Sequence, residues 1–377
     1  MYKSNNNNKL NVDYYLLSSN TNHDDSKPKA RQSSVWCSCG CVASIIAISF
    51  TIFVLIVLIA YTWLYTECQH SLKPVDEDIS FMPDTIAFGS CQSNWMPHSI
   101  INKINSNVFI YLGDNIYGDD GVEIISWFPK HWLWYRNVLY NKLSCRHSFQ
   151  KLVSRTNYVL SMWDDHDYGA DNEGKDNPIR RESQAKFLDF WRIPKSSERR
   201  RDVGIYGSYR FNASGSSVLI ILPDVRSFSD LPQRENAKLL GESQWIWLED
   251  TIRTKRSDII IVATGTQFVD QSVTFDASIW SNFPDEKHRL ESLLNPSNTI
   301  FISGDVHRAG IMRSHSGFLD ITSSPLSLNG KGPDGTNRIQ ASGNNNYMYM
   351  DNYGLLDLKR GIASVNGIDG SVLDVKI

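Results

Sequence analysis

Ionisable side chains follow several short apolar runs along this sequence of 377 residues. They are Cys91, Asp114 with Tyr117, the segment Asp164-Asp165-His166-Asp167, and Asp305 with His307. If the apolar runs are neighbouring strands, these side chains converge, and such groups repel one another or stay unsatisfied unless cations neutralise them. Carboxylate oxygens suit hard cations such as Ca²⁺, whereas thiolate, phenolate and imidazole also suit iron. The pattern therefore predicts a metal centre.

Each motif taken alone has a simpler interpretation. A Gly-Asp pair after a strand is common in turns, a single histidine such as His307 is often structural, and the segment 163–174 (WDDHDYGADNEG) could be a solvated acidic loop. That segment does not fit an EF-hand loop, because no register places a Gly at the sixth position together with a Glu at the twelfth. The simpler interpretations would each have to place a polar cluster at a strand end independently, so a shared site explains the pattern better.

The elements that must position these residues alternate along the chain. Apolar runs that end in small or ionisable residues are predicted as strands buried on both faces. Amphipathic patterns between them predict helices at 181–191 and 241–252. Strands that alternate with helices make an α/β fold, whose ligand site lies at the carboxyl ends of the strands. The predicted strand segments are 85–91, 107–115, 158–167, 217–226, 258–267 and 298–307.

Residues 42–65 form a long apolar run without a charged residue. At 1.5 Å per residue, such a helix crosses the ~30 Å hydrocarbon layer of a bilayer. A cleaved signal peptide would have a shorter apolar region nearer the start, followed by small residues, whereas this run ends in aromatic ones. Basic residues precede the run and acidic residues follow it, which predicts a type II membrane protein with an extracellular or luminal C-terminal part. The basic residues are Lys27, Lys29 and Arg31, and the acidic ones are Glu67, Asp76, Glu77 and Asp78.

The segments around this run differ in composition. Residues 1–41 are rich in Asn and Ser and have no sustained apolar pattern, which predicts a disordered cytosolic tail. Residues 66–84 contain prolines and several acids, and they are predicted to form a short stalk. The remaining residues, 85–377, are numerous enough to form one large domain with its own core.

Several residues are candidates for covalent modification. Three cysteines at alternate positions beside the cytosolic edge of the run suit S-palmitoylation, with a small metal site or unmodified thiols as alternatives. Cys68 and Cys145 lie on the predicted oxidising side and could pair. The sequon at Asn212 lies in the part predicted to be outside, and it predicts a glycan. The three membrane-edge cysteines are Cys37, Cys39 and Cys41.

The composition excludes several classes of protein. With 38 Lys+Arg against 41 Asp+Glu, the formal net charge is −3. No large positive field is present to recruit phosphate backbones, so nucleic acid is not a predicted partner. The counts of 23 Gly and 6 Cys exclude collagen-like and disulfide-scaffold proteins. Composition leaves the oligomeric state open.

Motifs from residue 85 onward resemble those of the PhoD-like (alkaline phosphatase D) metallophosphatases, in the order expected for that family. The resemblance implies a calcineurin-like α/β sandwich of two mixed β-sheets flanked by helices, here preceded by a single transmembrane helix. It implies a phosphate ester as substrate, and iron (Fe³⁺) and calcium as cofactors, with other divalent metals as alternatives. The motifs are Ile86-Ala87-Phe88-Gly89-Ser90-Cys91, Leu112-Gly113-Asp114-Asn115-Ile116-Tyr117-Gly118-Asp119, Trp163-Asp164-Asp165-His166-Asp167-Tyr168-Gly169, Gly241-Glu242-Ser243-Gln244-Trp245, Ile302-Ser303-Gly304-Asp305-Val306-His307 and Asn352-Tyr353-Gly354.

The resemblance also implies roles for individual residues. His166 would stand beside the leaving group as a general acid or transition-state donor. Arg226 would touch the phosphate, with a salt bridge near Asp224 as the alternative. The family usually has Asn then Asp after its His-Asp-aromatic-Gly sequence, and the order Asp171-Asn172 here leaves open which residue reaches the metal. The implied metal ligands are Cys91, Asp114, Tyr117, Asp164, Asp165, Asp171 and His307.

The predicted chemistry is in-line attack on phosphorus by hydroxide that a metal activates, with His166 donating a proton on the opposite side. A phosphomonoesterase of the alkaline phosphatase D type is the main expectation. A phosphodiesterase that acts on lipid-linked or wall-type diesters would leave the same metal-bound phosphate and is an alternative. A non-catalytic surface-binding protein with this fold is another, but a lapsed enzyme would tolerate loss of the costly clustered charge at Cys91, Asp114, His166 and His307.

Overall fold

A computed structural model describes residues 36–66, 68, 71–119, 129–232, 236–269, 279–342 and 345–377. Of the predicted tail at 1–41, residues 1–35 and the side chains of 36–41 lie outside this description. The chain divides into two units, residues 1–59 and 60–377, and each is described here by itself.

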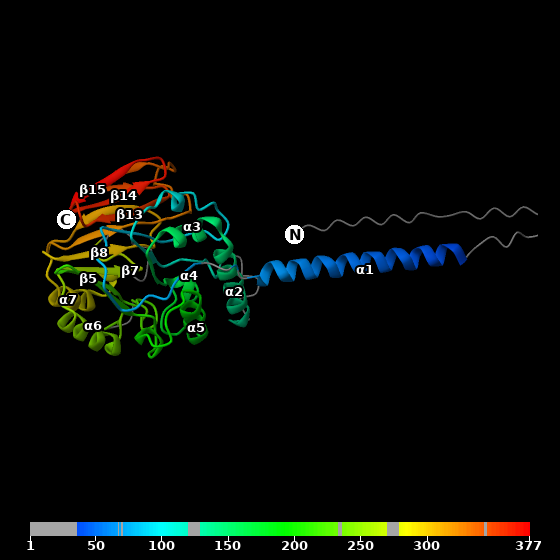
Figure 1. Ribbon diagram of the computed structural model, residues 1–377, viewed down its shortest axis with the longest axis horizontal. Coiled ribbons are helices and arrows are strands. Elements are labelled where there is room, and N and C mark those ends of the chain that lie inside the picture. The colour runs from blue at the N-terminus through cyan, green and yellow to red at the C-terminus, as the bar shows by residue number, and fades with distance from the viewer. Residues whose placement is uncertain are drawn as a thin grey trace, which may run out of the picture. The chain divides into compact units, whose positions relative to one another are not determined.

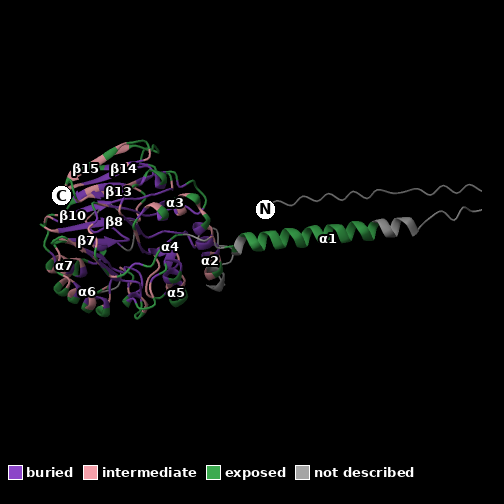
Figure 2. Ribbon diagram, viewed as in Figure 1, coloured by how far each residue is buried: buried purple, intermediate pink, exposed green. Residues whose placement is uncertain are grey.

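The described part of the first unit is helical. Helix α1 (Trp36–Tyr65) contains the apolar segment Val42–Trp63, which has a mean hydropathy of 3.0 and is not buried against the described residues. Figure 2 shows that the residues of this helix whose burial is described are exposed. By length and composition, it is the one candidate membrane-spanning helix among the described residues. An apolar surface of this extent is costly in water, which supports the predicted anchor.

The second unit contains a six-stranded sheet whose order is β15-β14-β13-β2-β3-β4. The strands β2, β3 and β4 pair in parallel, whereas β13, β14 and β15 form an antiparallel extension beside β2. Every residue of β3 is buried, as expected for a parallel strand covered on both faces. The strands are β2 (Thr85–Gly89), β3 (Val108–Leu112), β4 (Tyr158–Met162), β13 (Asn352–Asp357), β14 (Ile362–Gly367) and β15 (Val372–Lys376).

A nine-stranded sheet has the order β1-β5-β6-β7-β8-β10-β9-β12-β11. Its central strands β6, β7, β8 and β10 are parallel, so their carboxyl ends lie at one edge. The strands are β1 (Asp78–Ile79), β5 (Gly207–Ala213), β6 (Ser216–Leu222), β7 (Ile259–Thr264), β8 (Thr299–Ser303), β9 (Ala309–Arg313), β10 (Leu319–Thr322), β11 (Ile339–Ser342) and β12 (Asn345–Met348).

Alternating side chains of β6 show how the sheets and helices are layered. Val218 and Ile220 belong to the large core that also contains the six-stranded sheet, whereas Leu219 and Ile221 belong to a second core with helices on the other face. Because successive side chains of a strand point to opposite faces, the nine-stranded sheet lies between the other sheet and these helices. The helices are α6 (Glu242–Thr254) and α7 (Pro284–Leu293) (Figure 1).

The outer face of the six-stranded sheet is covered by α2 (Pro129–Cys145), α3 (His147–Arg155) and α5 (Arg180–Phe190). Tyr111 of β3 packs its ring against Phe149 of α3 and against Trp191, which follows α5. The result is a sandwich of two mixed sheets with helices on both outer faces, as the family resemblance implied. The predicted helices at 181–191 and 241–252 correspond to α5 and α6.

The segment predicted as a stalk packs against the domain, which corrects that prediction for its described residues. Leu72, Val75 and Ile79 are buried in or against the core, and β1 pairs with β5. Apolar residues at this spacing stay in contact with the core because burial of each stabilises the fold by about 1.5–3 kcal/mol. In addition, Cys68 forms a disulfide with Cys145 at the end of α2.

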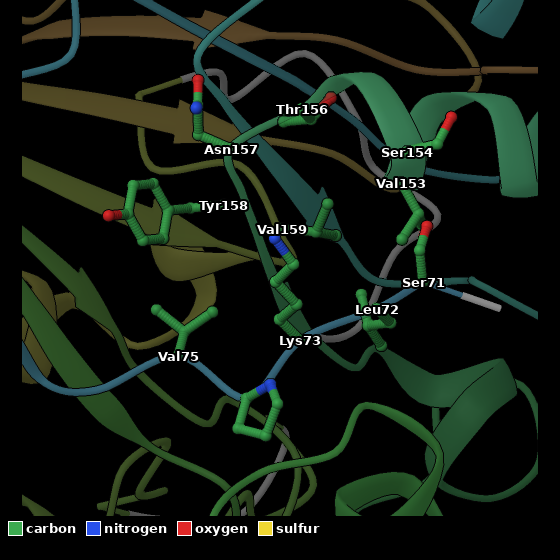
Figure 3. Close-up of a pocket in the computed structure, with 11 residues that line it drawn as sticks. Ser71, Leu72, Lys73, Val75, Val153, Ser154, Thr156, Asn157, Tyr158 and Val159 are labelled. Carbon is green, nitrogen blue, oxygen red and sulfur yellow. The ribbon is translucent and has the colours of Figure 1, made fainter.

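A small cavity of about 200 Å³ lies beside this segment (Figure 3). It separates the segment from the end of α3 and the start of β4, and none of its lining residues is a predicted metal ligand. The lining residues are Ser71, Leu72, Lys73, Pro74, Val75, Val153, Ser154, Thr156, Asn157, Tyr158 and Val159.

Candidate metal centre

The predicted ligands converge because they follow the carboxyl ends of parallel strands in both sheets. Cys91 follows β2, Asp114 follows β3 and Asp165 follows β4, all in the six-stranded sheet. His307 follows β8 of the nine-stranded sheet. The hydroxyl of Ser90 connects the two sheets, because it accepts from the Asp305 amide (3.1 Å) and donates to the Ser323 carbonyl (3.2 Å).

One group of candidate ligands combines sulfur, oxygen and nitrogen. The ligand atoms of Cys91, Asp114 and His307 all lie within 4.8 Å of one another. The Tyr117 hydroxyl lies 2.9 Å from His307 Nε2 and 3.4 Å from Asp114 Oδ2. The Cys91 sulfur lies 3.3 Å from the same carboxylate oxygen. The four side chains are therefore close enough to surround one cation.

Two further groups contain mainly carboxylates. Ligand atoms of Asp114, Asp165 and His166 lie within 4.8 Å of one another, and so do those of Asp164, Asp165 and Asp305. Asp114 thus belongs both to the group with Cys91 and to the group with Asp165. Asp114 would therefore be within reach of a cation held by either group.

The backbone at the centre is strained. Cys91, Asp114, Asp305 and His307 all have positive φ angles, of 58°, 49°, 73° and 52°. Residues other than glycine rarely adopt this left-handed region, which costs of order 1–3 kcal/mol each, and such strain clusters at functional sites. The fold therefore holds these residues in conformations that local preference does not favour.

Gly113 makes close approach of two strand ends possible. Its φ is +100°, and a Cβ atom on it would lie 2.5 Å from the Cβ of Asp164. Any other residue would push the loop after β3 away from the loop after β4. The Gly-Asp pair thus brings Asp114 next to the acidic segment.

The electrostatics of the first group fit a bound cation. Burial, followed by the charges of nearby acids, raises the pKa of the Cys91 thiol well above its ordinary value. Burial also raises the pKa of Asp114 and of Tyr117. Asp114 Oδ1 is buried and has no hydrogen-bond partner among the described residues. A positive ion at this position would satisfy that oxygen and stabilise the ionised forms.

His307 is suited to act as a ligand. Desolvation of its ring, together with the nearby His166, lowers the pKa of His307 below its ordinary value. A metal-binding histidine must be neutral, so its environment favours the required form.

Arg226 lies on the carboxylate side of the centre. Its guanidinium is 1% exposed, forms a close ion pair with Asp164, and lies 3.7 Å from Asp165 Oδ2. Although burial would raise the pKa of Asp165, Arg226, His166 and two backbone N–H groups lower it below the ordinary value. Of the two contacts considered for Arg226 from sequence, a salt bridge is present, but its partner is Asp164. The backbone N–H of Arg226 donates to Asp224.

His166 has one nitrogen fixed by a carboxylate. Its Nδ1 lies 2.6 Å from Asp119 Oδ1, while the other oxygen of Asp119 accepts from the Asp171 backbone N–H at 3.0 Å. Burial lowers the pKa of His166, but the charges of Asp114, Asp165 and Asp119 raise it more strongly, to about 11. This pairing orients the ring, leaving Nε2 as the nitrogen that can face a substrate.

The structure does not bring every predicted residue into the groups. Asp171 is 73% exposed, and its carboxylate lies 3.9 Å from His166 Nε2. Asp167, the last acid of the WDDHD motif, accepts from the backbone of Asn115, Ile116 and Asp164. It joins the loops after β3 and β4 and also takes part in the capping box of the short helix α4 (Asp165–Tyr168).

Two residues that the structure brings to the centre were not predicted as ligands from the sequence: Asp305, which was expected at a strand end beside His307, and Asp119. The carboxylate of Asp305 belongs to the third group, and its carbonyl lies 3.1 Å from the Cys91 sulfur. Asp119 follows Gly118 in a motif that was recognised, yet its partner His166 is 47 residues away along the chain. The available signal for Asp305 was its position at a strand end beside His307, whereas Asp119 lies farther along the loop after β3 and carried none.

The family model described as PhoD-like phosphatase matches residues 86–365, more than half of the chain. The chain belongs to the PhoD-like phosphatase family. With the candidate metal-ligating groups described above, it is a metallophosphatase. No curated protein matches the sequence.

Solved structures align with this PhoD-like phosphatase at low identity. The structure of PhoD aligns with a TM-score of 0.59 and 15% identity, over 81% of this chain and 70% of that one. A dimetal phosphatase from Danio rerio aligns at 0.46 and 14%, over 78% and 99%. GAP50, described as the anchor in the inner membrane complex of Plasmodium, aligns at 0.47 and 12%, over 78% and 88%.

The loop after Cys91 is fixed by many hydrogen bonds. Asn94 Nδ2 donates to the Tyr117 carbonyl at 2.8 Å, and the Tyr117 N–H donates to Asn94 Oδ1 at 3.0 Å. The Ser93 hydroxyl accepts from two backbone N–H groups that follow it. His98 Nε2 lies 2.8 Å from the Ser93 carbonyl, and the ring is 5% exposed. The neutral form of His98 is thus part of the loop that supports Tyr117.

We predict that His98 makes this PhoD-like phosphatase less stable in mild acid. Burial and the charge of Arg146 lower the pKa of His98 from 6.5 to about 4. Its contribution to stability is therefore complete above pH 6.5 and is lost as pH falls towards 4, by up to about 3 kcal/mol. Thermal unfolding of the full chain in detergent micelles, measured from pH 7 to pH 4 beside His98→Gln, should show a smaller pH dependence in the variant. Parallel curves would contradict the assignment.

Proposed function

We propose that this PhoD-like phosphatase hydrolyses phosphate monoesters at a centre that holds two kinds of cation. The observation that supports the proposal best is the shared position of Asp114, which lies beside both Cys91 and Asp165. One side of this carboxylate offers sulfur, phenol and imidazole, and the other offers mainly carboxylate oxygens.

The chemistry of the donors favours Fe³⁺ on the first side and Ca²⁺ on the second. Cys91, Tyr117 and His307 supply ligand types that suit iron, whereas Asp165 and Asp305 supply the oxygens that calcium prefers. The bound cations would supply Lewis-acid charge that lowers the pKa of a water molecule and draws charge from the phosphoryl oxygens.

His166 is the proton donor in this proposal. Asp119 fixes its Nδ1 atom, and the carboxylates around it favour the protonated ring. A leaving oxygen that faces Nε2 would receive that proton as the bond to phosphorus breaks. Arg226, which is buried against Asp164, positions the carboxylates in this proposal.

We predict that removal of a metal ligand abolishes hydrolysis without unfolding the domain. The purified full chain in detergent micelles should hydrolyse an aryl phosphate monoester, lose this activity on chelation, and regain it with iron and calcium. Asp114→Asn and His307→Ala should each lower kcat by more than about 100-fold, because cation-based stabilisation of the transition state is lost. Asp374→Asn changes an exposed acid on β15 and is the matched control.

His166→Ala separates proton donation from cation binding. The variant should keep its metals, and its rate should fall by about 100- to 10,000-fold for an alkyl ester but less for an aryl ester, because a good leaving group needs little protonation. Equal losses for both esters would remove the acid role. Faster cleavage of diesters than of monoesters would favour the phosphodiesterase alternative, and a folded, metal-replete protein inert to both would favour a binding protein.

The proposed iron site predicts a coloured protein. A ferric ion bound by the Cys91 thiolate and the Tyr117 phenolate should show charge-transfer absorption in the visible range. Cys91→Ser and Tyr117→Phe should shift or abolish this band and lower the iron content, whereas Tyr353→Phe, a tyrosine on β13, should not. A colourless wild-type protein that contains only zinc would refute the iron assignment and leave a metallohydrolase possible.

We also propose a type II orientation with the phosphatase domain outside the cytosol. The disulfide between Cys68 and Cys145 lies on the C-terminal side of α1, and disulfides persist in oxidising compartments. The sequon at Asn212 lies at the hairpin between β5 and β6, where Ser214 is exposed. Palmitoylation of Cys37, Cys39 and Cys41, whose side chains lie outside the described part, remains a prediction.

The orientation predicts a glycan at Asn212. Synthesis of the full chain with microsomes should give a mass increase that Ser214→Ala abolishes, and protease added from the cytosolic side should leave residues 70–377 intact. Digestion of this segment, with no mass shift dependent on Asn212, would reverse the orientation.

A further inference from the structure

An exposed apolar loop lies close in sequence to the metal centre. Trp95 is 62% exposed and Met96 37% exposed, and Pro97 beside them is also exposed. We define residues 95–97 as the Trp95 loop. Trp95 follows Cys91 by four residues, so the loop is continuous with the segment that supplies a candidate ligand.

The backbone of the Trp95 loop is fixed although its side chains are exposed. The Ser93 hydroxyl accepts from the N–H groups of Trp95 and Met96, both at 3.1 Å. The guanidinium of Arg146 donates to the Met96 carbonyl at 2.9 Å and closely to the Asn94 carbonyl. Because these hydrogen bonds already order the backbone of the loop, holding the Trp95 side chain outward costs no further backbone conformational entropy.

The same Arg146 connects the loop to the end of the membrane helix. Arg146 follows Cys145, whose disulfide partner Cys68 lies only three residues after Tyr65, the last residue of α1. Three residues span at most about 11 Å, so the junction of α2 and α3 that supports the loop is tethered close to the point where the chain leaves the apolar helix.

We propose that the Trp95 loop contacts the membrane in which this chain is anchored, and that it holds the metal centre next to the lipid surface. The proposal rests on the membrane anchoring proposed above. The lipid interface is the environment that tryptophan prefers, because its ring is apolar and its N–H can still meet water or a headgroup. The short tether keeps this surface within reach of the loop, and the loop's exposed residues are uncharged.

The test measures how deeply the Trp95 loop lies in the membrane. In a background with the three N-terminal cysteines replaced by serine, Trp95→Cys is labelled with an environment-sensitive fluorophore, and the full chain is reconstituted into phosphatidylcholine vesicles. In vesicles that also contain lipids with a nitroxide on the acyl chain, the fluorescence of the label should be quenched at least about twofold. In vesicles without nitroxide lipids, the emission of the label should be shifted to the blue. The replaced cysteines are Cys37, Cys39 and Cys41.

Two labelled controls make the outcomes distinguishable. Ile246→Cys changes a residue on α6 that is 63% exposed, which matches Trp95, and its label should not be quenched; Figure 1 shows α6 and α2 at different sides of the domain. Ile52→Cys in α1 should be strongly quenched.

Unquenched labels at both Trp95→Cys and Met96→Cys, with Ile52→Cys quenched and unfolding midpoints unchanged, would overturn the loop's membrane contact and leave the anchor and the phosphatase activity standing. An unquenched Ile52→Cys would overturn the anchor and the membrane contact together.

Discussion

Mutual repulsion of buried negative charge is the constraint on which this structure depends. Asp114, Asp164 and Asp165 are each at most 3% exposed, and they lie together at the ends of β3 and β4. Removing such charges from water costs several kcal/mol each unless positive charge is nearby. Arg226 compensates Asp164, His166 lies beside Asp114, and the remaining charge is what a bound cation would neutralise. The loops that follow the strands therefore hold together negatively charged side chains that would otherwise repel one another.

The two sheets solve this problem jointly. Each supplies strands whose carboxyl ends meet, and the Ser90 hydroxyl fastens the loop after β2 to the loop after β8. Positive φ angles at Cys91 and His307 place both residues where an ordinary turn would not. A single parallel sheet offers ligands from one edge only, whereas the sandwich surrounds the centre from both sides. The fold thus explains why sulfur, nitrogen and oxygen donors can approach one position.

The residues at strand ends could be predicted from the sequence, whereas the residues that contact them from other strands could not. Cys91, Asp114 and His307 each follow an apolar run, so their convergence could be predicted from the α/β pattern alone. Asp119 carried no such signal, because its role depends on a ring brought to it by another strand. The stalk prediction was wrong because prolines and acids surround Leu72 and Ile79 in the sequence. The apolar residues between them are recognised as buried only once their contacts with the folded domain, including the pairing of β1 with β5, are known.

The centre also has a consequence for biosynthesis. Cys91 and Asp305, whose atoms are 3.1 Å apart, are separated by 214 residues along the chain. Most of the donors therefore leave the ribosome long before Asp305 and His307, and the ligand set cannot close until β8 has joined its sheet. Metal acquisition is then a late event in maturation, and the ion supply of the compartment in which the C-terminal part finishes folding decides which metal the protein acquires.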